Sequence, residues 1–96
     1  MGMQERLHEK LTAAFAPTHL DIIDDSHKHA GHVGVPEEGE SHFRVLIVSD
    51  AFQGKSRVER QRMVYDLLAI EFQEGVHALS LVTRTVEEER VRQGGD

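Results

Sequence analysis

Residues 42–49, with the sequence His-Phe-Arg-Val-Leu-Ile-Val-Ser, constrain the fold of this chain more than any other segment. The run is rich in β-branched and aromatic residues, which favour a β-strand. Apolar residues fall on both of its faces, as is typical of a strand that is covered from both sides or lies centrally in its sheet. We therefore predict that this strand forms the centre of a sheet.

A helix and another strand follow the central strand. Ser56 and Glu59 have the Ser-x-x-Glu pattern of a capping box, which predicts the start of a long helix, and Gly75 is well placed to end it. The alternating apolar residues of segment 76–83 predict a third strand. Because the intervening helix is long enough for a right-handed crossover, we expect this strand to be parallel to the central one.

The segment before the central strand predicts a helix and a first strand. Residues 3–16 carry apolar side chains every three or four positions, which indicates an amphipathic helix that ends before Pro17. Residues 19–26 predict a strand. Residues 27–41 contain glycines and almost no bulky apolar residue, so we expect a loop that joins two antiparallel strands.

The complete order is helix, strand, strand, helix, strand, helix, because Thr85 and Glu88 repeat the capping-box pattern at the start of a short final helix. This order predicts an α+β fold with a three-stranded mixed sheet packed against helices. The 96 residues suit a single domain over 1–96, with its core in about residues 3–90. The expected core residues are Leu11, Phe15, Ile22, Val45, Ile47, Val64, Leu68 and Leu79.

The composition excludes several classes of protein. The chain has no cysteine, so it can form neither a disulfide nor a metal site from its own thiolates. Its formal net charge of −6 argues against a surface built entirely for nucleic acid. It shows no apolar run long enough to cross a membrane and no signal peptide, so we expect a cytoplasmic protein without membrane contact.

Histidines are the first candidates for chemistry. His27, His29 and His32 lie within six positions of the predicted loop, and imidazole binds zinc, copper and iron. Their spacing matches no strong zinc signature, and a solvated polar loop is the alternative interpretation. His77 begins the third strand on the same face as Leu79, which is compatible with either a core histidine or a metal ligand.

A catalytic role finds little support. Ser41, Ser49 and Asp50 are candidate nucleophiles or acids near His42, but none of them lies in a recognisable catalytic motif. We therefore expect that the protein is not an enzyme.

A basic segment begins the second predicted helix. Residues 52–62 contain four cations and one acid, a local charge of +3 in an acidic chain. The four cations are Lys55, Arg57, Arg60 and Arg62. Such a segment can hold phosphate groups, and an ordinary solvated helix face is the alternative.

Several stretches together resemble the BolA family in order, spacing and residue type. They are Asp24-Asp25-Ser26 and residues 40–45, 48–54, 60–65 and 76–81, and the match covers about residues 3–90. The resemblance implies a class II KH-like fold, which agrees with the order of elements above. It also implies a heterodimer with a monothiol glutaredoxin that shares a glutathione-ligated [2Fe-2S] cluster, in cluster trafficking and iron homeostasis, with no cofactor held by this chain alone.

The resemblance also implies which residues would hold the cluster. In the family, a glutaredoxin cysteine and glutathione hold one iron. The BolA chain holds the other iron through a histidine at the position of His77 and a histidine or cysteine of the first inter-strand loop. Two imidazoles can replace two thiolates on one iron, as in Rieske centres. His29 matches the loop ligand best, His32 is the alternative and His27 is third.

The sequence departs from the expected pattern in two places. The family usually has Arg-His-Arg where this chain has Gln61 between two arginines, so a role of that histidine is absent or altered here. A Gly-x-x-Gly occurs at residues 31–34, outside the position where KH domains clamp nucleic acid, so we do not infer RNA binding. Some BolA proteins bind DNA as transcription regulators, and the segment from Lys55 to Arg62 would carry that alternative function. The sequence does not decide whether the chain also forms homodimers.

Overall fold

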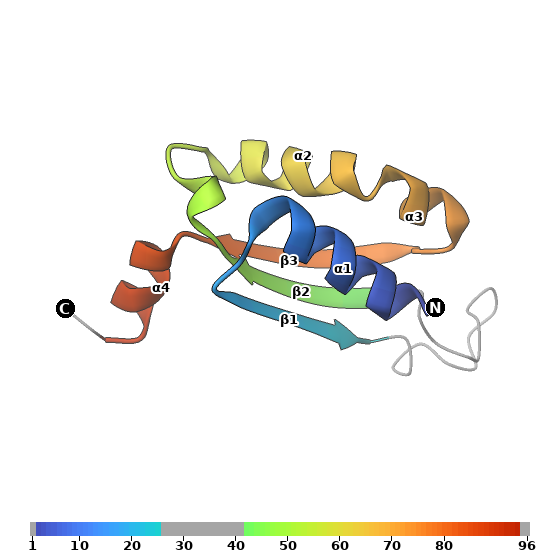
Figure 1. The fold of residues 1–96 in the computed structure, drawn as a ribbon, viewed down its shortest axis with the longest axis horizontal. Coiled ribbons are helices and arrows are strands. Elements are labelled where there is room, and N and C mark those ends of the chain that lie inside the picture. The colour runs from blue at the N-terminus through green and yellow to red at the C-terminus, as the bar shows by residue number, and fades with distance from the viewer. Residues whose placement is uncertain (1, 26–41, 95–96) are drawn as a thin grey trace.

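The computed structural model describes residues 2–25 and 42–94. Their secondary structure follows the predicted order, with one predicted helix divided into two (Figure 1). The elements are α1 (Met3–Phe15), β1 (His19–Asp24), β2 (His42–Val48), the 3-10 turn η2 (Asp50–Phe52), α2 (Arg57–Leu67), α3 (Ala69–Glu74), β3 (Ala78–Arg84) and α4 (Val86–Arg92). No helix in these two described ranges is long and apolar enough to cross a membrane.

The sheet has the predicted topology. Its order is β1-β2-β3, with β2 in the centre. β1 is antiparallel to β2 and pairs His19 with Val48, whereas β3 is parallel to β2 and pairs His42 with Ala78. The prediction of a central strand with one antiparallel and one parallel neighbour is therefore confirmed.

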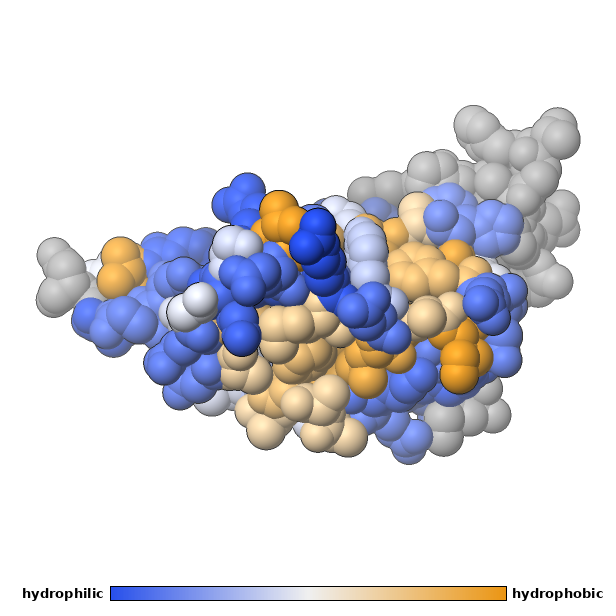
Figure 2. All heavy atoms as spheres, turned by 90° about the horizontal axis from the view of Figure 1, so that it is seen from above, coloured by the Kyte–Doolittle hydropathy of each residue, from blue (hydrophilic) through white to orange (hydrophobic). Residues whose placement is uncertain are grey.

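One hydrophobic core joins α1 and α2 to the sheet. Its buried residues include Leu7, Leu11, Phe15, Phe43, Val45, Ile47, Phe52, Val64, Leu68 and Val76. Six of the eight predicted core residues are in this group, and Ile22 and Leu79 are partly buried against it because they lie on the two edge strands. Seen from the α2 side, hydrophilic residues dominate the end that carries α4, and apolar residues gather over the middle (Figure 2).

Local signals explain most helix boundaries. Both predicted capping boxes are present: Ser56 Oγ accepts from the Glu59 N–H at 3.1 Å, and Thr85 Oγ1 accepts from the Glu88 N–H at 3.1 Å. Gly75 ends α3 with φ 148°, a conformation that side chains rarely allow.

The structure differs from the prediction at two boundaries. The expected single helix after residue 56 is divided at Leu68, whose φ of −100° and ψ of 17° are not helical. Leu68 is almost fully buried, so it is in contact with the rest of the core. The periodicity of apolar residues in the sequence does not indicate a break in the helix at this position. The third strand begins at Ala78, two residues later than expected, so His77 precedes the strand.

Candidate metal site and basic pocket

His77 lies in the connection between α3 and β3. Its neighbour Val76 is buried, but His77 itself is exposed. The alternation that would place His77 beside Leu79 on the core face does not apply, because β3 begins only at Ala78. His77 is therefore an accessible imidazole, and the core-histidine interpretation is wrong.

A second imidazole lies next to His77. His42 begins β2 and is half-buried, and the centroids of the two rings are 6.0 Å apart with an interplanar angle of 32°. The parallel register explains this proximity, because His42 pairs with Ala78, the residue after His77. Metal–nitrogen bonds are about 2 Å long, so rings at about this separation can approach one ion. The predicted parallel alignment of the two strands was a sequence signal that could have identified His42.

Both ends of the predicted ligand loop emerge at the same end of the sheet. The Asp25 N–H donates to the His42 carbonyl oxygen at 2.7 Å, which closes the base of segment 26–41 beside His42. His27, His29 and His32 belong to that segment and lie outside the described residues. Among the residues that are described, no group of three or more histidine, aspartate or glutamate side chains could hold a metal ion.

Ser49 has a structural role. It is buried, its hydroxyl donates to the Phe15 carbonyl at 2.6 Å, and it accepts from the Ala51 N–H at 3.0 Å. These contacts attach the end of α1 to the start of η2. His42 lies at the other end of β2, so Ser49 and His42 do not form a nucleophile and base pair. Ser41 lies outside the described residues.

Arg60 of the basic segment is buried, and its guanidinium makes four hydrogen bonds. Its guanidinium donates two hydrogen bonds to the Glu88 carboxylate, at 2.8 and 3.1 Å. It also donates to the main-chain carbonyls of Lys55 and Thr83, and it packs 5.9 Å from the Phe52 ring centroid. The basic segment predicted that Arg60 binds phosphate or lies on a solvated helix face, whereas in the structure Arg60 attaches α4 to α2 through Glu88.

The same ion pair changes the acidity of Glu88. The hydrogen bonds from Arg60, followed by the one from the Thr85 N–H, lower the pKa of Glu88 to about 2. The capping-box pattern predicted that Glu88 begins α4, but it carried no information on the partner from a distant helix.

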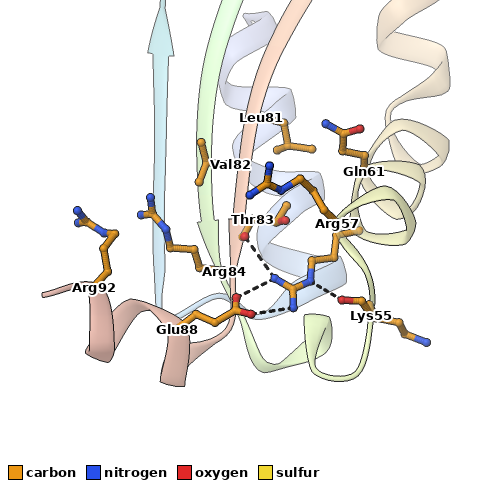
Figure 3. A pocket seen from close by; sticks show the side chains of 10 residues that line it. Lys55, Arg57, Gln61, Leu81, Val82, Thr83, Arg84, Glu88 and Arg92 are labelled. Atoms are coloured by element: carbon orange, nitrogen blue, oxygen red, sulfur yellow. Dashed lines mark hydrogen bonds and ion pairs between the residues drawn. The ribbon is translucent and has the colours of Figure 1, made fainter. Parts of the chain in front are cut away.

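The described residues line a pocket of about 760 Å³, which we call the basic pocket. It lies between the start of α2, the second half of β3 and α4 (Figure 3). Its charged lining residues are Lys55, Arg57, Arg60, Arg84, Arg92 and a single acid, Glu88. Lys55 and Arg57 are exposed and have no ion-pair partner within the described ranges. Arg62 is exposed on the same helix but does not line the pocket.

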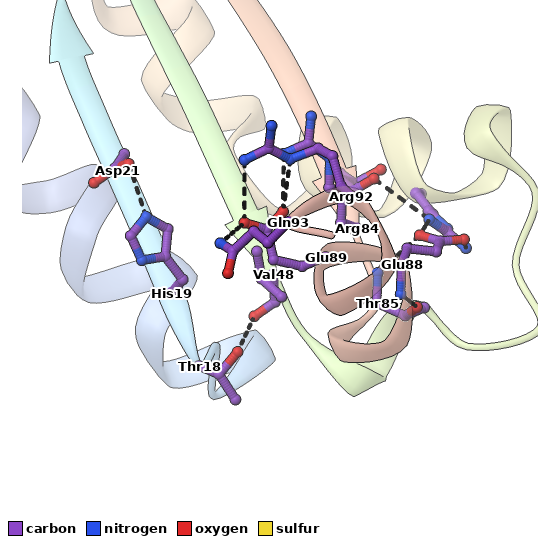
Figure 4. A network of polar contacts seen from close by, with 12 residues as sticks. Thr18, His19, Asp21, Val48, Arg84, Thr85, Glu88, Glu89, Arg92 and Gln93 are labelled. Atoms are coloured by element: carbon purple, nitrogen blue, oxygen red, sulfur yellow. Dashed lines mark hydrogen bonds and ion pairs between the residues drawn. The ribbon is translucent and has the colours of Figure 1, made fainter. Parts of the chain in front are cut away.

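A network of polar contacts fixes the far side of the basic pocket (Figure 4). Glu89 binds Arg84 at 3.0 Å and Arg92 at 3.2 Å, and it also accepts from the Gln93 side chain. The contact with Arg92, followed by those with Gln93 and Arg84, holds the pKa of Glu89 below its ordinary value. The basic pocket and His77 lie at opposite ends of β3.

Comparisons with known proteins support the resemblance. A family model described as BolA-like protein matches residues 11–88. The DNA-binding transcriptional regulator BolA of Escherichia coli is 47% identical over 88 residues, which cover 92% of this chain and 80% of the relative. SufE-like protein 1, chloroplastic/mitochondrial, of Arabidopsis thaliana is 50% identical over 84 residues, which cover 83% of this chain but only 23% of that longer protein. The solved structure of BolA1 from Arabidopsis thaliana gives a TM-score of 0.81 at 41% identity, over 92% of this chain and 96% of that one.

Proposed function

This chain belongs to the BolA family, and from that premise we propose that it acts as a binding partner of monothiol glutaredoxins and not as an enzyme. In this proposal the two proteins form a heterodimer that shares a glutathione-ligated [2Fe-2S] cluster. The heterodimer serves iron–sulfur cluster assembly and trafficking, and thereby iron homeostasis.

The observation that carries the proposal is the exposed imidazole of His77 at one end of the sheet. A neutral imidazole offers a nitrogen lone pair that suits iron, and His77 presents it where another protein can reach it. His42 lies beside it, and both ends of segment 26–41 are anchored next to His42. One end of the sheet thus holds His77 and the two residues, Asp25 and His42, that flank the segment to which the family resemblance assigns the second ligand.

The proposed ligand set follows from this arrangement. His77 and one loop histidine hold one iron, with His29 as the first choice, His32 as the alternative and His27 as the third. The glutaredoxin cysteine and glutathione hold the other iron. His42 packs near His77 and is positioned to limit the orientations of its ring.

Reconstitution of the heterodimer tests the proposal. The purified chain, a monothiol glutaredoxin, glutathione, iron and sulfide are mixed anaerobically, and absorption and circular dichroism spectra are recorded. We expect a spectrum that differs from that of the glutaredoxin homodimer, and we expect His77→Ala to abolish the difference. His19→Ala is the matched control, because His19 is an exposed histidine at the opposite end of the sheet. A wild-type spectrum from His77→Ala would remove His77 from the ligand set.

DNA binding is the second candidate function. It is favoured by the Escherichia coli relative, which is named as a DNA-binding transcriptional regulator. Lys55, Arg57 and Arg62 would contact phosphates, while Arg60 would act indirectly through its pair with Glu88. Binding to duplex DNA should then weaken steeply as salt rises, and alanine at Arg57 and Arg62 should weaken it for all sequences alike. Undetectable DNA binding at low salt would eliminate this candidate.

A further inference from the structure

The basic pocket takes no part in the proposed cluster site, which lies beyond the other end of β3. We propose that this pocket binds a small ligand that carries two or more phosphate groups. The inference stands independently of the glutaredoxin partnership, because it uses none of the histidines at the other end of the sheet.

The charge of the pocket is the first argument. Five cations and one acid line it, and Glu89 behind Arg84 and Arg92 adds a second acid. With Glu59, which interacts electrostatically with Lys55, five positive and three negative charges leave +2 in this region, whereas the whole chain carries −6. A concave surface with a charge opposite to that of the chain attracts anions locally.

The cations of the basic pocket differ in whether an acid already pairs with them. The Glu88 carboxylate occupies Arg60, and Glu89 is shared between Arg84 and Arg92. Lys55 and Arg57 have no such partner among the described residues, and both are exposed at the start of α2. These two side chains can therefore bind a ligand without breaking an ion pair.

The free hydrogen-bonding groups on the main chain of β3 favour one kind of ligand. β3 is an edge strand, and the Tyr65 hydroxyl and the Arg60 guanidinium donate to its carbonyls at residues 79 and 83, at 3.3 and 3.4 Å. The main-chain N–H and carbonyl groups of these two residues therefore point away from β2. Those of Leu81, which lies between them, point the same way. With two of the three outward carbonyls already bonded, the edge mainly offers N–H donors. Free N–H donors suit an oxyanion, which only accepts hydrogen bonds. They suit an added β-strand less well, because such a strand must also donate hydrogen bonds to carbonyl groups.

The distribution of the cations indicates more than one phosphate. Figure 3 shows Lys55 and Arg57 on the α2 side of β3 and Arg84 and Arg92 on the other side, with the carboxylate of Glu88 between the two groups. A ligand that contacts both groups at once must present negative charge at more than one position, as a chain of two or three phosphates does. The volume of about 760 Å³ also falls within the range of about 300–1,000 Å³ that is usual for small-molecule sites.

Titration of the full chain with inorganic triphosphate at low salt, followed by calorimetry, tests the proposal. We expect saturable binding, and at least tenfold weaker binding by the double variant Lys55→Ala/Arg57→Ala. Both side chains are exposed, and the contact of Lys55 with Arg60 uses its main-chain carbonyl, so this variant keeps the observed packing. Arg62→Ala is the matched control for the single variant Arg57→Ala, because each removes one positive charge from α2 and Arg62 lies outside the pocket. It should change the dissociation constant less than twofold.

Three results would overturn the proposal. They are the absence of saturable triphosphate binding by the wild-type chain, unchanged binding by the double variant, and equal weakening by Arg57→Ala and Arg62→Ala, which would indicate general charge attraction. A parallel titration with duplex DNA separates the two sources of phosphate. If triphosphate fails to bind while duplex DNA binds and the double variant weakens that DNA binding, the surface is assigned to nucleic acid and the small-ligand site is refuted. The cluster spectrum of the double variant should match that of the wild type, so a failure here is distinguishable from a failure of the glutaredoxin proposal.

Discussion

Glu71 is a buried carboxylate on α3 that is held by two cations of α1. Arg6 and Lys10 bind its two oxygens at 2.8 and 2.9 Å, and its side chain is only 2% exposed. Burial raises the pKa of Glu71, but the hydrogen bonds from Lys10 and Arg6 outweigh this effect and leave the pKa below its ordinary value. This contact joins two elements that are distant in the sequence, and no local pattern indicated it.

We expect Glu71→Gln to destabilise the fold. Breaking a buried ion pair costs about 3–5 kcal/mol, but Arg6 and Lys10 are partly exposed and can rehydrate, so we expect a loss of about 1–3 kcal/mol. Urea unfolding measures this free energy. Glu74→Gln is the control, because Glu74 also pairs with Arg6 but is half exposed, and it should change stability by less than about 0.5 kcal/mol. Equal effects of the two variants would contradict this account.

The pair of Arg60 and Glu88 predicts a dependence of stability on pH. Because the folded-state pKa of Glu88 is about 2 and an unfolded glutamate titrates near pH 4.3, its ionised form favours the folded state. The contribution of ionised Glu88 to the free energy of unfolding is complete above about pH 5 and is lost as the pH falls towards 2. Glu88→Gln can keep the capping box but loses the charge. The difference in unfolding free energy between variant and wild type should therefore shrink between about pH 4 and pH 2. A difference that stays constant down to pH 2 would refute the assigned role.

At the level of elements, the capping box of α2 contributes to the free energy of unfolding. Ser56 and Glu59 satisfy each other's main-chain N–H groups, at 3.1 and 2.9 Å. We expect Ser56→Ala to lower the free energy of unfolding by about 1 kcal/mol, because the first turn loses a hydrogen-bond acceptor. Thermal or urea unfolding can detect this loss. Ser80→Ala in β3 provides a comparison at an exposed serine without a cap, and an equal loss there would argue against the capping explanation.

Local patterns predicted the elements better than they predicted the contacts between them. Both capping boxes, the end of α3 at Gly75 and the mixed sheet follow from short-range signals and chain connectivity. Short-range patterns indicated neither the division of the helix at the buried Leu68 nor the burial of Arg60. A run of basic residues looks the same in sequence whether it faces solvent or a distant carboxylate, so the role of Arg60 could not be predicted.

For the whole molecule, the candidate sites lie at opposite ends of the sheet. The sequence and the family resemblance predicted His77 as a candidate ligand, and the structure places it in an exposed position beside His42. The basic pocket could not be predicted, because it combines residues of α2, β3 and α4 that are far apart in the sequence. The separation predicts that variants at one end leave binding at the other end unchanged.

The claim that this chain supplies histidine ligands to a shared cluster is central, and isotope labelling tests it most directly. The chain is labelled with ¹⁵N-histidine and combined anaerobically with unlabelled glutaredoxin, glutathione, iron and sulfide. The reduced cluster is then studied by pulsed electron paramagnetic resonance. We predict a strong ¹⁵N coupling from directly bound imidazole in the wild type and in His19→Ala, and the loss of this coupling in His77→Ala. A reduced cluster without ¹⁵N coupling in the wild-type heterodimer would contradict histidine ligation by this chain.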